Sequence, residues 1–440
     1  MTVNIKHKNK VNFTYAYSLL VIFLFLFIPY RELLSYLIST NVKFIPDILI
    51  IGFFVYDVLV NKKYKKINHI DIYYILFLSI AFIGSYSNTS IKAFVVQSRS
   101  IVLYYLIYFI ARDKIFENSF YITFKKALKI NTGILMVFAI IEKVFCKDCL
   151  FPKEWVDNIM YADNFPRVYS FFDNPNTFGA YLVLTFLFCI YLELNEKKID
   201  IYFHSLLVLG ILLTGSRSST IALFIIIMFI IIYELKLRVY RKPALIITIL
   251  AIMCLSSVFN IVLSNVSKSI SVSFSSRDMM VDESNIMFDR FNEMTDNNIF
   301  AKSNTNGRLY SIKTGFKIYS DYPLFGSGFG SYGDAASLIL GSPIYNQYSI
   351  PNNFYADNEY IKVLAETGTI GFLSYTLFLL TLLIMVFKSK SMLKITIFFA
   401  ICFLGLFYNV FEVQIISMFF WFILGSTKFD ESNKKVILVN

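Results

Sequence analysis

A succession of apolar runs, each close to membrane-spanning length, constrains this chain more than any other feature. About 20 apolar residues in a helix cross the ~30 Å hydrocarbon core of a bilayer. Hydrophobic residues make up 57% of the chain, above the roughly 45–50% of soluble domains. We therefore predict an all-α integral membrane protein with about 12 transmembrane helices in a single polytopic domain, residues 1–440. The expected spans are 13–30, 44–60, 69–86, 93–111, 128–145, 176–194, 199–214, 219–234, 243–263, 367–387, 394–409 and 411–425.

Basic residues indicate the orientation of these spans, because Lys and Arg accumulate in cytoplasmic loops. The clusters fall on alternate loops, and this pattern predicts that both termini are cytoplasmic. The net charge of +11 is therefore an orientation signal and does not indicate a nucleic-acid partner. The first run has no signal-peptide cleavage site, so we expect a retained helix. The clusters are Lys6–Lys10, Lys62–Lys66, Arg112–Lys126, Lys197–Lys198, Lys236–Lys242, Lys388–Lys394 and Lys428–Lys435.

Residues 264–366 form one large loop, which this orientation places outside the cytoplasm. After Arg308, apolar residues recur at helical spacing at Leu309, Ile312, Phe316 and Tyr319. This periodicity predicts an amphipathic helix that lies on the bundle or on the membrane surface. Pro323 is expected to end the helix. The Gly326–Gly330 turn then brings the chain back to the bundle, and its GxGxG spacing does not match a dinucleotide-binding site.

Two shorter outer loops carry arginines beside turn residues. In the first, Arg167 precedes Asp173 and Asn176, and the Asn-Pro pair within that segment predicts a turn that caps a helix. In the second, Ser216 and Arg217 lie in a tight hairpin at 213–219. Arg217 could simply reach the membrane interface. Hydroxyl groups, exposed backbone and a guanidinium are also the groups that bind phosphate.

The segment Asp357–Asn358–Glu359–Tyr360 precedes the span at 367–387. Asp357 is predicted to cap a helix, and Glu359 occupies the first turn, which the helix dipole favours for an acid. Alternatively, a carboxylate there can accept a proton from a hydroxyl nucleophile.

Four features, taken in their order along the chain, resemble the O-antigen ligase/polymerase superfamily. They are the Arg167–Asn176 segment, the hairpin at Ser216, the Arg308 helix with its glycine turn, and the Asp357 segment. The resemblance covers roughly residues 160–387. It implies transfer of a glycan from a polyprenyl-diphosphate-linked oligosaccharide at the bacterial cytoplasmic membrane, without a metal or another cofactor.

By this resemblance Arg217 and Arg308 would hold the diphosphate, with Arg167 as a further candidate. Asp357 would be the base, with Glu359 and Asp173 as rivals. The remaining expected substrate-binding residues are Ser216, Asn176, Asn358, Glu359 and Tyr360.

The related ligases carry a histidine where this chain has Asp357, and the only histidines are His7, His69 and His204. This departure favours a polymerase of lipid-linked repeat units for O-antigen or capsule over a ligase. Partners are then a chain-length regulator and a flippase of the same pathway. A transporter of lipid-linked sugar is a third alternative, although the spans carry few central charges apart from Arg99. A disulfide between Cys146 and Cys149 is an open question.

Overall fold

The computed structural model describes residues 2–62, 67–112, 114, 116–145, 167–237, 242–273, 307–352 and 354–429. Within these ranges the regular structure is helical, and no strand occurs. The chain forms two compact units, residues 1–47 with 115–296 and residues 48–114 with 297–440. Cys146, Cys149 and the loop residues 274–306 lie outside the described residues.

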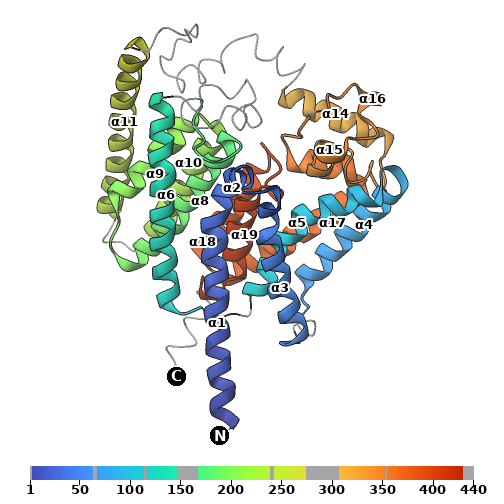
Figure 1. Cartoon of the computed structure of the whole chain (residues 1–440), viewed down its shortest axis with the longest axis horizontal. Helices are drawn as coiled ribbons and strands as arrows, with labels where there is room; N and C mark the ends of the chain where they lie inside the picture. The colour runs from blue at the N-terminus through green and yellow to red at the C-terminus, as the bar shows by residue number, and fades with distance from the viewer. Residues whose placement is uncertain are drawn as a thin grey trace. The chain divides into compact units, whose positions relative to one another are not determined.

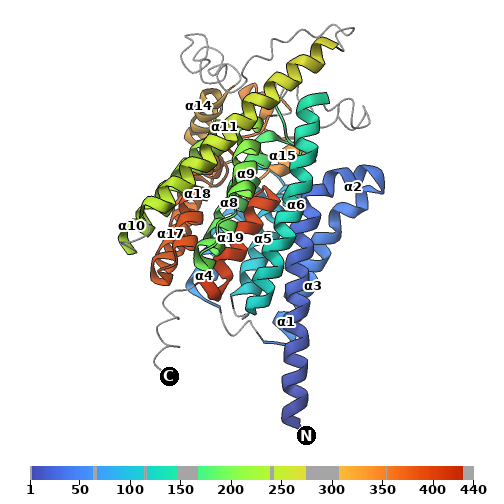
Figure 2. The same ribbon diagram turned by 90° about the vertical axis from the view of Figure 1, so that its left-hand side faces the viewer.

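The first unit is built around α8, whose apolar residues are buried along most of its length. Asn174 caps this helix by accepting a hydrogen bond from the backbone N–H of Asn176, and Pro175 follows at the first helical position. Helices α9 and α10 pack against α8, and α11 packs against α9 (Figure 2). The helices of this unit are α1 (Thr2–Phe27), α2 (Arg31–Leu37), α6 (Asn118–Phe145), α8 (Pro175–Glu196), α9 (Ile201–Thr214), α10 (Arg217–Leu237) and α11 (Lys242–Ser273).

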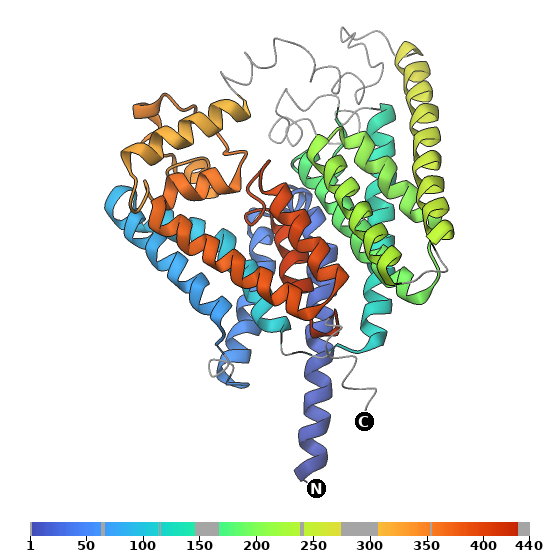
Figure 3. The same ribbon diagram turned by 180° about the vertical axis from the view of Figure 1, so that it is seen from behind.

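The second unit pairs α17 with α4 and α19 with α5, and three shorter helices gather near one end of α17 (Figures 1 and 3). Of these, α14 packs directly on α17, and α15 packs on α5. The helices are α4 (His69–Asn88), α5 (Ile91–Ala111), α14 (Arg308–Asp321), α15 (Ala335–Leu340), α16 (Tyr345–Tyr348), α17 (Glu359–Ser389), α18 (Met392–Leu404) and α19 (Gln414–Gly425). Helix α3 (Ile45–Leu59) begins at the boundary between the units.

Every expected span overlaps a helix, and the described residues fit an all-α multi-pass membrane protein, whereas the count of about 12 spans stays a prediction. Five helical stretches among the described residues are long and apolar enough to cross a membrane: Tyr15–Leu37, His69–Asn88, Ile91–Ala111, Pro175–Glu196 and Glu359–Ser389. Apolar segments of α9, α10, α11, α18 and α19 are shorter.

Helix α17 is interrupted at Gly368, where φ is 63° and ψ is −167°. The break separates a polar first segment, Glu359–Thr367, from the apolar remainder. It falls where the sequence placed the start of the span at 367. Only glycine adopts this backbone conformation readily, and a Cβ at Gly368 would overlap the backbone of the glycine turn.

Helix α14 forms where it was predicted and ends before Pro323, and most of the residues that it buries are small or polar. The buried residues are Ser311, Thr314, Gly315 and Ile318, whereas Phe316 is 47% exposed. The small residues allow close approach to α17, since a Cβ at Gly315 would overlap the side chain of Ile361. The exposed apolar residues remain suited to a membrane surface.

Candidate functional site

In the first unit, Arg167 braces three segments. Its guanidinium donates from Nε to the Thr214 carbonyl and from Nη2 to Asn176 Oδ1, both at 2.8 Å. The side chain is 8% exposed. Arg167 therefore holds the C-terminal end of α9 against the beginning of α8, a role that the sequence did not reveal.

The Ser216 hydroxyl caps α10. It accepts hydrogen bonds from the Ser219 hydroxyl at 3.0 Å and from the Ser219 backbone N–H at 3.4 Å. Gly215 ends α9 with φ of 59°. This sharp turn places Arg217 at the first residue of α10, where the helix dipole adds to its positive charge. Ser216 therefore has a structural role, and binding of a phosphate at this hairpin stays a prediction.

The loop that carries Arg167 is fixed by a buried acid that the sequence analysis missed. Glu142 on α6 accepts hydrogen bonds from the backbone N–H groups of Tyr169 and Ser170. Ser170 has φ of 53°. Glu142 lies within the expected span 128–145, and nothing in the sequence links it to Tyr169, 27 positions away. Asp173, the rival base, lies in the same loop and is exposed.

In the second unit, the glycine turn docks between α4 and α17, as expected. The backbone N–H groups of Ser327 and Gly328 donate to the carbonyls of Ala365 and Glu366 at 3.0 and 2.9 Å. The Glu366 carboxylate accepts from the backbone N–H groups of Ser331 and Tyr332. Phe329 N–H donates to the Ser85 hydroxyl of α4 at 2.8 Å. The loop after α14 is therefore fixed to the bundle.

Arg308 and Asp357 lie close enough to interact electrostatically. Burial raises the pKa of Asp357, and the positive charge of Arg308 opposes that rise. The guanidinium also stacks on Phe407, 5.0 Å from the ring centroid. The second unit thus brings together two residues that the sequence predicted for one site.

The predicted cap at Asp357 is wrong by one residue. Asn358 caps α17, because its Oδ1 accepts from the backbone N–H groups of Tyr360 and Ile361, both at 3.0 Å. Asp357 therefore does not cap the helix, and Glu359 occupies the first turn as predicted. Asn358 and Tyr360 also donate to the carbonyls of Leu406 and Cys402. These two predicted substrate-binding side chains anchor α17 to α18 and the segment after it.

Glu412, which the sequence analysis did not single out, meets Lys362 in the buried interior of this unit. The Lys362 ammonium pairs with Glu412 Oε1 and lies 3.4 Å from Glu359 Oε1. Gln97 donates to Glu412 Oε1 at 2.8 Å, and Ala335 N–H donates to Oε2 at 3.0 Å. The cluster ties α5, α15 and α17 to the segment between α18 and α19.

The predicted site residues therefore form one group in each unit. Arg167, Asn176, Ser216 and Arg217 belong to the first, and Arg308 with Asp357–Tyr360 belongs to the second. In the ranges that the structure covers, no group of three or more His, Cys, Asp or Glu residues is placed to hold a metal ion.

A comparison with known families decides what kind of domain carries these residues. A family model described as O-antigen ligase matches residues 203–376. Residues 203–376 are thus similar to the O-antigen ligase family. This match confirms the resemblance to the O-antigen ligase/polymerase superfamily. The matched region includes Ser216, Arg217, Arg308 and Asp357, whereas Arg167 and Glu412 lie outside it. No curated protein matches the chain.

Proposed function

We propose that this protein is a membrane glycosyltransferase that joins polyprenyl-diphosphate-linked oligosaccharide repeat units into a surface polysaccharide. The electrostatic interaction of Arg308 with Asp357, within the region that is similar to O-antigen ligase, carries the proposal. Reaction takes place on the outer side of a bacterial cytoplasmic membrane, with both termini in the cytoplasm, because the basic clusters alternate in that sense.

In the proposed reaction, a hydroxyl oxygen of the acceptor sugar attacks the anomeric carbon of the donor. A carbon–oxygen bond forms there, and the bond from that carbon to the lipid diphosphate breaks. The hydroxyl proton passes to Asp357, and the leaving diphosphate takes the electron pair. A carboxylate whose pKa is raised by burial is a stronger base than an exposed one.

Cationic side chains stabilise the charge that develops on the diphosphate. Arg308 and Arg217 are the proposed ligands, and neither requires a metal. Arg167 is a weaker candidate because two of its donor atoms already hold Thr214 and Asn176. Ser216, Asn176, Asn358, Glu359 and Tyr360 remain proposed contacts for the glycan, several of them in addition to a structural role.

A ligase that transfers finished glycan to a final acceptor is the second candidate, because the matching family model is itself described as O-antigen ligase. Asp357 favours the polymerase, since the related ligases carry a histidine there. A chain-length regulator and a flippase are the proposed pathway partners.

Glycan from cells that carry single-site variants tests the proposal. Arg217→Ala and Arg308→Ala should leave protein in the membrane but replace the ladder of long chains by single repeat units. Lys317→Ala is the matched control, because this exposed cation on α14 stacks on Tyr348 and lies outside the proposed site. A normal ladder from both arginine variants would reject the proposed site.

A further inference from the structure

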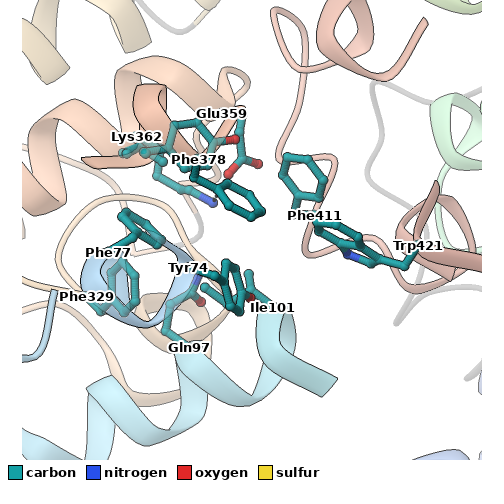
Figure 4. A pocket seen from close by; sticks show the side chains of 12 residues that line it. Tyr74, Phe77, Gln97, Ile101, Phe329, Glu359, Lys362, Phe378, Phe411 and Trp421 are labelled. Carbon is teal, nitrogen blue, oxygen red and sulfur yellow. Dashed lines mark ion pairs between the residues drawn. The ribbon is translucent and has the colours of Figure 1, made fainter. Parts of the chain in front are cut away.

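A small cavity lies inside the second unit, beside the ion pairs of Lys362. Its volume is ≈ 20 Å³, and about 10–15 Å³ is enough for one water-sized group. Aromatic rings form most of its wall, and Gln97, Glu359 and Lys362 form a polar side (Figure 4). The rings belong to Tyr74, Phe77, Phe329, Tyr375, Phe378, Phe411 and Trp421.

Four side chains of the cavity wall carry buried polar atoms without a hydrogen-bond partner among the described residues. They are Glu359 Oε2, the hydroxyl oxygens of Tyr74 and Tyr375, and Trp421 Nε1. A buried polar atom without a partner costs roughly 1–3 kcal/mol. Native structures seldom leave several such atoms around one space. The cavity therefore has the chemistry of a binding site for a polar group.

Of the two carboxylates that contact Lys362, only Glu359 keeps an oxygen that can accept a further hydrogen bond. Both oxygens of Glu412 are engaged, one by Lys362 and Gln97 and the other by the Ala335 N–H. Glu359 Oε1 faces Lys362 at 3.4 Å, which leaves Oε2. Two carboxylates share one ammonium here, so the cluster favours a guest that donates a hydrogen bond.

The unpartnered atoms indicate which chemical group fits the cavity. A carboxylate oxygen only accepts, an indole N–H only donates, and a phenol can do either. A hydroxyl group is both donor and acceptor, and it fits a space of this size. Aromatic rings around it suit the apolar faces of a carbon skeleton to which the hydroxyl is attached.

We propose that this cavity receives one hydroxyl group of the acceptor sugar, which donates a hydrogen bond to Glu359. Lys362 and Glu412 are positioning residues that hold Glu359 in place. This inference rests on the proposed function, because it assigns the acceptor of the same reaction. Asn358 and Asp357, which immediately precede Glu359, are both partly exposed.

Trp421 provides a direct readout, because the chain has only two tryptophans. In a Trp155→Phe background, Trp421 is the sole tryptophan, and its ring lines the cavity. The free oligosaccharide of the repeat unit, without lipid, is titrated into the purified full-length protein while the emission of Trp421 is recorded. We expect a saturable change that a deoxy analogue lacking the bound hydroxyl produces only at about tenfold higher concentration.

Glu359→Gln should weaken binding of the intact sugar by about tenfold, since a charge-assisted hydrogen bond is lost. Glu117→Gln, at an exposed site, should bind as the parent does. Glu412→Gln should weaken binding of the intact sugar but not of the deoxy analogue, which a merely structural defect would not do.

An emission spectrum that no sugar alters would mean that the cavity holds only water, and would overturn the proposal. So would a deoxy series in which every analogue binds as the parent sugar does. Sugar binding needs no turnover. Binding without glycan transfer would therefore reject the proposed function alone, and transfer without a hydroxyl-dependent signal would reject this inference alone.

Discussion

Gly328→Ala tests whether the glycine turn fixes the large loop to the bundle. Gly328 has φ of 87°, and a Cβ there would lie 2.7 Å from Ser85 Cα and 2.9 Å from the Gly84 carbonyl oxygen of α4. Non-bonded carbon atoms prefer about 3.5–4.0 Å. The atoms that would be struck belong to a helix backbone, so they cannot move aside by a change of rotamer.

Two terms give the size of the effect. A positive φ costs a residue with a Cβ roughly 1–2 kcal/mol, and overpacking costs roughly 1–3 kcal/mol. If the turn shifts outward instead, the hydrogen bond from Phe329 N–H to Ser85 is lost, with a net cost of about 0.5–1.5 kcal/mol. We therefore expect a loss of about 2–5 kcal/mol. In a unit of about 150–250 residues, each kcal/mol lowers Tm by about 2–4 °C.

The assay is thermal unfolding of the purified protein in one detergent, followed by the fraction that remains monodisperse. Gly328→Ala should lower the midpoint by roughly 10 °C. Gly52→Ala is the control, because Gly52 lies on α3 and a Cβ there meets no atom within 4 Å. This control should be neutral or stabilising by about 0.5–1 kcal/mol. Equal midpoints for the two variants would refute the docking of the turn.

Three further predictions concern charged groups. Asp357→Asn should lower the rate of glycan transfer by about 10²–10⁴-fold without loss of folded protein; full activity would exclude this base. The pKa of Asp357 is raised by burial and lowered by Arg308, and activity requires the ionised form. Arg308→Gln should therefore raise this pKa further and move the acidic limb of the pH–rate profile to higher pH, while an unmoved limb would separate the two residues. Glu193→Gln breaks a buried cluster with His204 and Lys129 and should lower the free energy of unfolding by about 3–5 kcal/mol. The control Glu196→Gln, on the same helix at a 45% exposed side chain, should lower it by at most about 1 kcal/mol. Similar thermal midpoints for the two variants would contradict this prediction.

The helices could be predicted from sequence because apolar length and turn residues are local signals. The expected start of the span 367–387 falls at the break at Gly368, and Pro323 marked the end of α14. The packed face of α14 could not be predicted in this way. The residues that α14 buries are mainly small or polar, among them Ser311 and Gly315, because these residues allow close contact with α17, whereas Phe316 of the apolar stripe is exposed.

Sequence analysis found the site residues that belong to a motif. It missed residues whose partners lie far away in the sequence. Arg308 and Asp357 lie near each other as expected. Glu412 was overlooked because it is a single acid at the beginning of the expected span 411–425, and its partners Gln97 and Lys362 lie 315 and 50 residues away. A lone acid in an apolar setting is nevertheless a usable signal, because a buried carboxylate requires partners.

Purified protein in liposomes that contain a lipid-linked repeat unit tests the central claim most directly. The products are separated by size and by the lipid that they carry. We expect the lipid-linked glycan to grow while one lipid diphosphate is released for each bond formed, and we expect Asp357→Asn liposomes to show neither. Transfer to a second, non-polyprenyl acceptor would establish a ligase instead. Movement of the lipid-linked unit across the bilayer without a new glycosidic bond would contradict the glycosyltransferase account.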